Sequence, residues 1–372
     1  MTAPLTLALI NGFLGAGKTT LIAAAAKRLQ ARGRRVAVIT NDQAADLVDT
    51  HNLRGQGLDV AEVAGGCFCC QFDGLMATLD GLRRGGSNPE IVLAEAVGSC
   101  TDISATVVQP LKDLHHDSVR LAPFTVMVDA PRLKNAVALA AEDQLGKDVL
   151  YIFDRQVEEA DLMLLNKTDL VSPAEIEALS AEMRRRRPGT PLIATAARTG
   201  VGVEAWIDAL LSGAGAGGGT GAGRSVLDLD YDRYAAGEAE LGWLNAHISL
   251  AQPADGWRAA AIALVERLRT AFRARGAAIA HLKVALNGAG GSVVIGLPDA
   301  SAEASISETG TADPAAPVTL VLNARIRLAP EDLRQEIERA LPGTAGTMTI
   351  LELSAFRPAR PQPTHRYGQP IA

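Results

Sequence analysis

The chain has 372 residues, of which 48% are hydrophobic and 21% charged, and its formal net charge is −6 at pH 7. This length allows two domains with hydrophobic cores, and the acidic balance excludes general nucleic-acid binding, which needs a basic surface. No apolar stretch approaches the ~20 residues of a membrane span, and the N-terminus has no basic segment or cleavage site before the first strand. We therefore expect a soluble, cytoplasmic protein.

Short apolar runs alternate with helical stretches from residue 5 to about residue 211. These runs are rich in Val, Ile, Leu and Ala and lack period-two alternation, as expected for strands buried on both faces. The pattern predicts an α/β fold with a mostly parallel sheet covered by helices. The expected strands are Leu5–Asn11, Arg35–Thr40, Ile91–Glu95, Phe124–Asp129, Asp161–Asn166 and Pro191–Thr195.

The first expected strand is followed by the sequence Gly12-Phe-Leu-Gly-Ala-Gly-Lys18-Thr19, which opens a helix. In this context the pattern predicts a phosphate-binding loop, because its backbone N–H groups wrap the phosphates and the helix N-terminus attracts anions. Lys18 is expected to act in catalysis by reaching the β- and γ-phosphates, and Thr19 to place its hydroxyl on Mg²⁺. The expected nucleotide-binding residues of this loop are Gly12, Gly15, Ala16, Gly17, Lys18, Thr19 and Thr20.

Two further expected strands lead into carboxylates. Asp42 follows the second strand, and Glu95 ends the third, just before Ala-Val-Gly98. We expect Asp42 and Glu95 to be catalytic residues that hold Mg²⁺ or the attacking water, and Gly98 to offer its N–H to the γ-phosphate. The alternative for Asp42 is a helix cap. No glutamine or arginine is evidently placed for hydrolysis, so we expect slow intrinsic turnover.

Three cysteines, Cys67, Cys69 and Cys70, follow a strand-like run and precede a helix. Thiols at a helix N-terminus have lowered pKa values, and three sulfurs this close together can converge on one tetrahedral ion. We expect Zn²⁺ or Co²⁺, with Ni²⁺ less favoured; the alternative is a buried or redox-active thiol cluster. Cys100 stands alone in the sequence, and we interpret it as a small packing residue; the less favoured alternative is that it joins this site.

A second nucleotide motif, Asn166-Lys167-Thr168-Asp169, follows the apolar run Leu162–Leu165. The carboxylate of Asp169 can accept hydrogen bonds from the two N–H groups that guanine presents and adenine lacks. Thr195-Ala196-Ala, at the end of the next expected strand, supplies a second contact to the base. The sequence therefore predicts GTP as the nucleotide, with Asn166, Lys167, Asp169 and Ala196 around its base.

The glycine-rich segment 212–224 is too flexible to hold one conformation and predicts a linker between domains. We expect a GTPase domain in residues 1–211, a smaller α+β domain with an antiparallel sheet in 225–356, and an extended Pro-rich tail in 357–372. The segment between Pro298 and Pro317 is expected to be an irregular, mobile excursion. The C-terminal strands are expected at Ala246–Ala251, Ala278–Leu286, Ser292–Leu297, Val318–Ile326 and Thr347–Leu353, with helices over Trp257–Arg275 and from Pro330.

With these motifs the N-terminal domain resembles the CobW-type metallochaperone GTPases, which are related to the urease and hydrogenase nickel-insertion GTPases. The resemblance rests on Gly12–Thr20, on Gly65-Gly-Cys-Phe-Cys-Cys70 and on Asn166–Asp169. It implies that Cys67, Cys69 and Cys70 bind the ion near the nucleotide and that GTP hydrolysis releases it to a client. The chain departs from the family after its second strand, at Asn41-Asp42, and after Glu95, where the sequence resembles the family's usual segment less closely.

The leading hypothesis is a GTP-dependent metallochaperone that delivers its ion to a client metalloprotein or cofactor-assembly enzyme docked on the C-terminal domain. One alternative is a regulatory G protein that controls cofactor loading of a partner enzyme, with structural or redox-sensing cysteines. Another is an energy-coupling subunit in the assembly of a corrinoid or other cofactor. The sequence leaves the oligomeric state open, and an oligomer is compatible with it.

Overall fold

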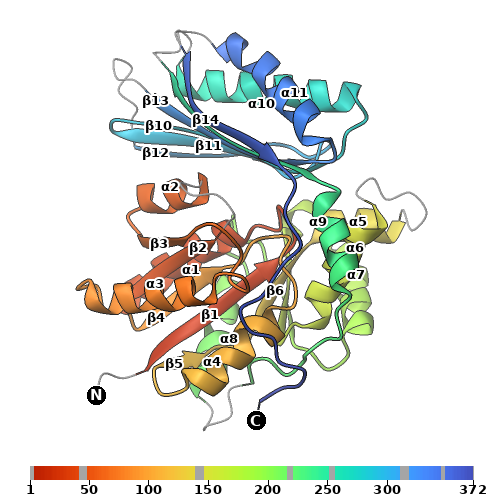
Figure 1. The fold of residues 1–372 in the computed structure, drawn as a ribbon. Helices are drawn as coiled ribbons and strands as arrows, with labels where there is room; N and C mark the ends of the chain where they lie inside the picture. The colour runs from red at the N-terminus through yellow and green to blue at the C-terminus, as the bar shows by residue number, and fades with distance from the viewer. Residues whose placement is uncertain are drawn as a thin grey trace.

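The computed structural model describes residues 4–41, 48–138, 146–215, 221–250, 256–310, 318–344 and 348–371. These residues form two stacked β-sheets with helices around them (Figure 1). One sheet is built from the N-terminal part of the chain, and the other from the part beyond residue 241. No helix within these ranges combines the length and the apolar character needed to cross a membrane.

The N-terminal sheet has eight strands, all joined by parallel pairings. The strands are β1 (Leu5–Gly12), β2 (Val36–Asn41), β3 (Asp59–Val63), β4 (Ile91–Glu95), β5 (Val119–Leu121), β6 (Thr125–Asp129), β7 (Leu162–Asn166) and β8 (Leu192–Ala194). Their order is β3-β2-β4-β1-β6-β7-β8, and β5 pairs with β1. This confirms the predicted α/β class, and each of the six expected strands is present.

The two faces of this sheet are buried in separate cores. Along β1, Leu7 and Leu9 belong to one core, whereas Ala8 and Ile10 belong to the other. Successive side chains of a strand point to opposite faces, so both faces of β1 are covered. This is why the strand reads as a continuous apolar run rather than an alternating one.

Helices connect the parallel strands. They are α1 (Lys18–Ala31), α2 (Val48–Gly55), α3 (Phe72–Arg84), α4 (Gln109–Leu114), α5 (Ala130–Ala138), α6 (Lys147–Glu158), α7 (Pro173–Arg186) and α8 (Val203–Gly215), with a π-helical turn at Ser104–Val108 and a 3₁₀ turn at Thr168–Leu170. Helix α7 begins with a capping box, in which Ser172 and Glu175 bond each other's backbone N–H groups. Helix α8 extends to Gly215, inside the predicted linker.

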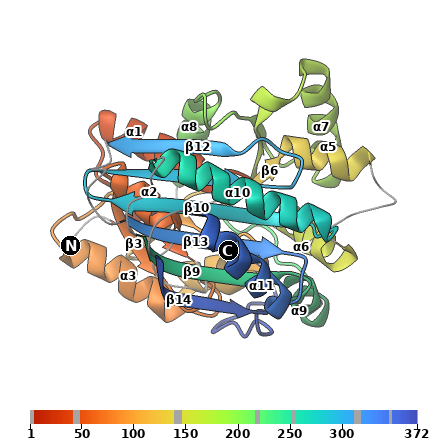
Figure 2. The ribbon, with the colours of Figure 1, turned by 90° about the horizontal axis from the view of Figure 1, so that it is seen from above.

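The C-terminal sheet has six strands in the order β12-β11-β10-β13-β9-β14, and every pairing is antiparallel. Its strands are β9 (Gly242–Leu250), β10 (Ile279–Gly288), β11 (Gly291–Leu297), β12 (Ser305–Gly310), β13 (Val318–Ile326) and β14 (Met348–Phe356). Helices α10 (Trp257–Ala274) and α11 (Pro330–Ala340), followed by a 3₁₀ turn at Leu341–Thr344, cover its outer face (Figure 2). The predicted α+β arrangement is therefore confirmed.

Two features of this part differ from the sequence-based expectation. Residues 305–310 form the edge strand β12, although the segment between Pro298 and Pro317 was expected to be irregular. The polar sequence of this strand concealed it, because its side chains are mostly exposed and make no apolar pattern. The second feature is helix α9 (Tyr231–Ala239), which lies before β9 and packs against α6.

The inner face of the C-terminal sheet lies over α2 and the carboxyl ends of the parallel strands (Figure 1). Val48 of α2 packs in a small core with Ala285 of β10 and Val321 of β13. Arg132 of α5 also connects the sheets, because its guanidinium donates to the carbonyls of Leu14 and Ala280. The nucleotide motifs at the strand ends therefore face the C-terminal sheet.

The tail beyond β14 returns to the N-terminal domain (Figure 1). Residues 357–371 contain no helix or strand. The backbone N–H of Thr364 donates to the Cys69 carbonyl at 2.9 Å, and that of Tyr367 donates to the Ala105 carbonyl at 3.0 Å. The tail thus runs over the loop that carries the cysteine motif.

Candidate nucleotide and metal site

The phosphate-binding loop joins β1 to α1, and its three glycines, Gly12, Gly15 and Gly17, all have positive φ. Two of them show why glycine is needed. Gly12 has φ 140° and Gly17 has φ 95°. A Cβ at Gly12 would lie 2.3 Å from the Met127 carbonyl oxygen, and one at Gly17 would lie 2.6 Å from Asn166 Nδ2. Both positions therefore require glycine for conformation and for space. Lys18 Nζ donates to the Gly12 carbonyl at 2.7 Å, across the mouth of the loop.

Asn166 connects the base-recognition motif to this loop. Its Nδ2 donates to the Ala16 carbonyl at 2.8 Å, and its Oδ1 accepts from the N–H of Ala197 at 3.1 Å. Lys167 has the left-handed conformation, with φ 63°, and forms an ion pair with Asp129. Asp169 lines the same cavity as the phosphate-binding loop. The structure therefore brings together the two motifs, which lie about 150 residues apart in the chain.

The two motifs line a cavity of about 450 Å³, a volume sufficient for a small-molecule ligand. The sequence-predicted residues on its wall are Gly15, Gly17, Lys18, Thr19, Thr20, Glu95, Gly98, Asn166, Lys167 and Asp169. Side chains from the C-terminal sheet, including Lys283 and Arg325, also line it. Ala196 is buried beside the cavity-lining residue Ala197. Asp42 lies outside the described residues.

Glu95 ends β4 beside the phosphate-binding loop. Thr19 Oγ1 donates to Glu95 Oε1 at 3.1 Å, whereas Glu95 Oε2 is buried without a hydrogen-bond partner among the described residues. Burial, and then the negative charge of Asp49, raise the pKa of Glu95 to about 7. A buried carboxylate oxygen without a partner, beside a threonine hydroxyl and a second carboxylate, fits the oxygen ligands that Mg²⁺ prefers.

Asp49, in the first turn of α2, was not identified from the sequence as a site residue. It forms an ion pair with Lys283 of β10, and it lines the same cavity as Glu95. Burial acts to raise the pKa of Asp49, but the charge and hydrogen bond of Lys283 outweigh it, so the pKa lies below its usual value. The sequence signal was weak, because an acidic residue in the first turn of a helix has an ordinary explanation in the helix dipole.

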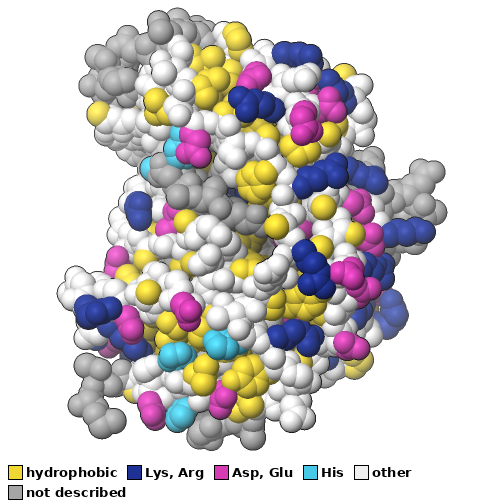
Figure 3. Space-filling view, viewed as in Figure 1, with side chains coloured by type: hydrophobic (Ala, Val, Ile, Leu, Met, Phe, Trp, Pro, Cys, Tyr) yellow, Lys and Arg dark blue, Asp and Glu magenta, His cyan; other side chains and the backbone are white. Residues whose placement is uncertain are grey.

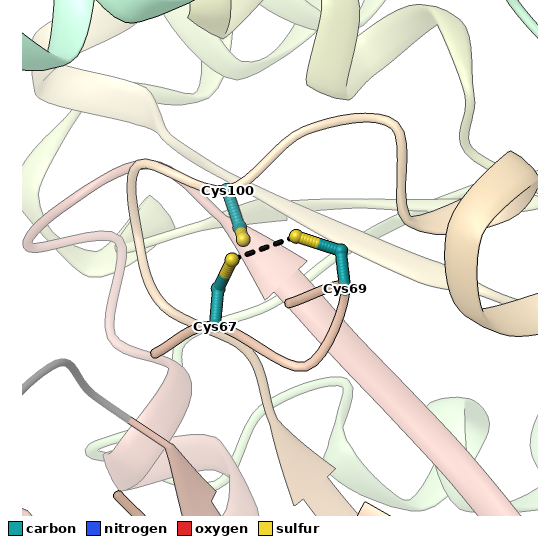
Figure 4. Close-up of side chains that lie close together, drawn as sticks. All are labelled: Cys67, Cys69 and Cys100. Carbon is teal, nitrogen blue, oxygen red and sulfur yellow. Dashed lines mark hydrogen bonds between the residues drawn. The ribbon is translucent and has the colours of Figure 1, made fainter. Parts of the chain in front are cut away.

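The cysteine motif lies in the turn between β3 and α3. The Sγ atoms of Cys67, Cys69 and Cys100 lie within 4.8 Å of one another and are buried (Figure 4). Cys67 and Cys69 point toward each other from one loop, with their Sγ atoms 2.7 Å apart, and Cys100 approaches from a second loop. Cys70 Sγ lies 3.6 Å from Cys67 Sγ and 3.7 Å from Cys69 Sγ. Three thiols with this convergence can ligate one transition-metal ion.

Cys100 is buried, as a packing residue would be, but its Sγ also joins the thiol cluster. The interpretation of Cys100 as a packing residue alone is therefore corrected. Its hydrogen bonds with Cys67 and Cys69 lower its pKa to about 6, despite burial, while those with Cys100 and Cys67 raise the pKa of Cys69 well above its usual range. Sequence reasoning missed Cys100 because its partners lie on another loop, which only the fold brings close.

Each cysteine loop is bonded to a residue of the nucleotide site. Asn41, at the end of β2, lines the nucleotide cavity, donates to the Gly66 carbonyl at 2.7 Å and accepts from the Phe68 N–H at 3.0 Å. Asn11, the residue before Gly12, donates to the Cys100 carbonyl at 2.9 Å. Gln156 of α6 donates to that carbonyl and to the carbonyl of Gly98. The loops that carry the thiols are thus hydrogen-bonded to residues at the carboxyl ends of β1 and β2, beside the nucleotide site.

Helix α9 closes the other side of the Cys100 loop. Ser99 Oγ donates to Glu238 Oε1 at 2.6 Å, and the Thr101 N–H donates to the Tyr234 hydroxyl at 3.3 Å. Burial raises the pKa of Glu238 well above its usual value, which favours the neutral form of this side chain beside the thiols.

Comparison with known proteins connects this site to a family. Residues 6–194 match the family described as CobW/HypB/UreG, nucleotide-binding domain. The zinc chaperone CobW of a Sinorhizobium species is 28% identical over 203 residues, which are 49% of this chain and 56% of that relative. The urease accessory protein UreG 2 of Methylobacterium radiotolerans is 32% identical over 212 residues, which are 54% of this chain and 90% of that relative.

Among solved structures, the Zn(II)-bound YjiA GTPase from E. coli aligns with 92% of this chain and 100% of its own, at 18% identity and a TM-score of 0.38. The chain spans about half the length of the curated zinc chaperones that it matches. The family match covers more than half of the 372 residues and includes the phosphate-binding loop, the cysteine cluster and the base-recognition motif. The chain therefore belongs to the CobW/HypB/UreG family of P-loop GTPases, with its nucleotide-binding domain in residues 6–194.

Proposed function

We propose that this chain is a nucleotide-gated metal carrier: it holds a transition-metal ion at the cysteine cluster and releases it to a client protein when GTP is hydrolysed. The observation that carries this proposal is the position of the cluster. Cys67 and Cys69 lie on the loop held by Asn41, whereas Cys100 lies two residues beyond Gly98, on the loop that borders the nucleotide cavity. A change in either loop therefore changes the distance between ligands.

The nucleotide chemistry follows from the positions of five side chains on the cavity wall. Lys18 stabilises charge on the β- and γ-phosphates, and Asp169 selects guanine. Thr19, Glu95 and Asp49 would hold Mg²⁺, which neutralises phosphate charge when it is bound. Asp42 remains a candidate for positioning the attacking water.

Gating works through the loop between Gly98 and Asp102. The Gly98 N–H binds the γ-phosphate, and the carbonyls of Gly98 and Cys100 remain bonded to Gln156. When hydrolysis removes the γ-phosphate, the loop loses that contact and relaxes. Cys100 then withdraws from Cys67 and Cys69, and the ion loses a ligand.

The donor set favours Zn²⁺ or Co²⁺, because both accept tetrahedral coordination by thiolates. The relatives' names point the same way, since two of the matched proteins are zinc chaperones named CobW. Thiolate ligands also accept Ni²⁺, so this ion is measured as a competitor. The proposed partner is a client metalloprotein or cofactor-assembly enzyme that docks on the C-terminal domain.

A regulatory G protein with redox-sensing cysteines is the second candidate. It is favoured by the close approach of Cys67 Sγ and Cys69 Sγ, at 2.7 Å, in a cluster that also contains the low-pKa thiol of Cys100. This function predicts nucleotide binding and hydrolysis that are indifferent to metal. It also predicts that mild oxidants remove free thiols reversibly.

The deciding experiment is a competition titration of Zn²⁺, Co²⁺ and Ni²⁺, in the presence of Mg²⁺ with either GDP or a non-hydrolysable GTP analogue. A metal carrier binds one ion much more tightly in the GTP-like state, and by reciprocity that ion tightens the GTP analogue by the same factor. Equal affinity in the two nucleotide states would refute gating. The Cys100→Ser variant serves as the control, because it retains both nucleotide motifs.

A further inference from the structure

One cation in the nucleotide cavity comes from the C-terminal sheet. Lys283 lies in the middle of β10, where it pairs with Gly296 of β11 and Asn323 of β13. Its neighbours Leu282 and Val284 enter the core beneath α10 and α11, so the alternation of the strand points Lys283 the other way, toward the nucleotide-binding domain. Its side chain is only 20% exposed.

Lys283 Nζ lies next to the residues that hold the phosphates and their cation. It forms an ion pair with Asp49 of α2 and lies 3.5 Å from Thr19 Oγ1. Thr19 in turn donates to Glu95, whose second oxygen has no hydrogen-bond partner in the part of the chain that the structure describes. The ammonium group is therefore placed among the carboxylates and the hydroxyl at the N-terminus of α1, where phosphates of a P-loop nucleotide bind.

Charge pairing in this cavity changes when a nucleotide enters. In the structure described, the charge of Asp49 is compensated by Lys283. A triphosphate brings several negative charges into a partly buried space, and a nearby ammonium binds them through charge-assisted hydrogen bonds. Asp49 is an acceptor suited to a hard divalent cation. An exchange of partners therefore keeps every buried charge paired, which a low-dielectric site requires.

We propose that Lys283 is a phosphate-binding residue, which the C-terminal domain contributes to the nucleotide site of the same chain. When GTP binds, the Lys283 ammonium group leaves Asp49 and pairs with the terminal phosphate. Asp49 is then free to face the cation beside Thr19. The backbone of Lys283 is hydrogen-bonded within a six-stranded sheet, so its side chain can reach the phosphate only when the whole sheet lies close to the nucleotide site. The C-terminal domain is thereby drawn to the GTP-bound site and loosened from the GDP-bound site.

This inference rests on the nucleotide site and is independent of the proposed metal cargo. It is therefore tested on metal-stripped protein supplied with Mg²⁺ alone. The variants are Lys283→Met, which keeps the length of the side chain without its charge, and Lys283→Arg, which keeps the charge. Arg334→Met is the matched control, because Arg334 lies exposed on α11 and pairs only with a residue of its own helix, Glu338, among the contacts described.

The measurement is the dissociation constant for GDP and for a non-hydrolysable GTP analogue, by displacement of a fluorescent nucleotide. We expect Lys283→Met to weaken the GTP analogue by about tenfold or more and to change GDP binding by less than about threefold. Lys283→Arg is expected to recover most of the preference for the GTP analogue, and Arg334→Met to match the wild type. Thermal unfolding of each variant identifies loss of folding.

The competing explanation is that Lys283 only neutralises Asp49 at the domain interface. In that case Lys283→Met changes the affinity for both nucleotides equally, and the Lys283→Met/Asp49→Asn double variant returns both toward the wild-type values. Either result overturns the proposal. If Lys283→Met unfolds, the Lys283→Gln variant decides the question: the proposal requires it to weaken the GTP analogue more than GDP, and a neutral pairing role changes both affinities equally.

Discussion

Arg366 Nε lies 2.8 Å from Asp102 Oδ2, and Asp102 follows Cys100 by only two residues. Asp102 is 1% exposed and has a left-handed backbone, with φ 66°. The Tyr231 hydroxyl of α9 donates to the same carboxylate oxygen at 2.8 Å. The tail and α9 therefore meet on the loop that carries the third thiol.

We expect Arg366→Gln to release the tail from this loop, because it leaves the buried Asp102 carboxylate without its cation. The free energy of unfolding should fall by about 1–3 kcal/mol. The thiols of metal-free protein should react several-fold faster with a disulfide reagent such as DTNB. Arg360→Gln is the control: Arg360 also forms a 2.8 Å ion pair in the tail, but with the exposed Asp232, and such pairs contribute about 0–1 kcal/mol. Equal effects of the two variants would contradict the anchoring role.

Single substitutions of Cys100 and Cys70 test which cysteines bind the ion. Cys100 belongs to the thiol cluster in the structure, and Cys70 belongs to the cysteine motif in the sequence. Cys100→Ser should weaken Co²⁺ binding by about tenfold or more and reduce the sulfur-to-cobalt charge-transfer absorption, since it removes a converging thiolate. Cys70→Ser should have the smaller effect, because Cys70 is absent from the triad within 4.8 Å. The reverse ranking would assign the ion to Cys67, Cys69 and Cys70.

Base selection is tested by Asp169→Asn. In the proposed base site, the carboxylate accepts two N–H groups of guanine. An amide offers one donor and one acceptor and so matches xanthine, which carries an oxygen in place of the amine. GTP affinity should fall by about a hundredfold and XTP binding should appear. The Asp208→Asn variant is the control, since Asp208 is an exposed partner of Arg32. Unchanged GTP affinity would remove Asp169 from the base site.

Glu159 gives stability a pH dependence with a definite sign. Its carboxylate accepts from Thr101 Oγ1 and the Ser104 N–H, and burial raises its pKa from 4.5 to about 8. The folded protein therefore retains a proton that the unfolded chain has already lost. Its contribution to stability is fully present below pH 4.5 and is lost as the pH rises to about 8, by at most about 1.4 kcal/mol per pH unit.

Glu159→Gln removes this titration, so its stability relative to the wild type should increase as the pH rises. Urea unfolding of both proteins at about pH 5, 6, 7 and 8 measures the difference. The Gln side chain has one acceptor oxygen for the two donors, Thr101 Oγ1 and the Ser104 N–H. We therefore also expect a loss of stability that is the same at every pH. A difference that stays the same at every pH would mean that Glu159 is ionised in the folded protein.

The fold of the N-terminal domain could be predicted because local patterns determine it. Strands buried on two faces read as apolar runs, and the phosphate-binding loop lies where a strand meets a helix. The edge strand β12 was missed because exposed polar residues show no apolar periodicity.

On the face drawn in Figure 3, positive and negative side chains intermingle, in keeping with the near balance of charges in the sequence.

The site was only partly predictable. The residues found from the sequence, such as Lys18 and Asn166, act within motifs whose spacing is local. Cys100, Asp49 and Lys283 act through contacts that depend on how loops and domains meet, and each has an ordinary explanation in its local sequence. Lys283, for example, reads as one polar position of an alternating strand until the opposite surface of the nucleotide cavity is known.

The tail that crosses the cysteine loop has a consequence for the order of synthesis. Thr364, which bonds Cys69 and Cys70, follows Cys70 by 294 residues, whereas all three converging thiols are made within the first 100 residues. Domains fold from the N-terminus as the chain leaves the ribosome, so the thiol cluster forms before its cover exists. Translation therefore gives thiol-reactive molecules and ions a period of access that ends when Thr364 and Tyr367 reach Cys69 and Ala105.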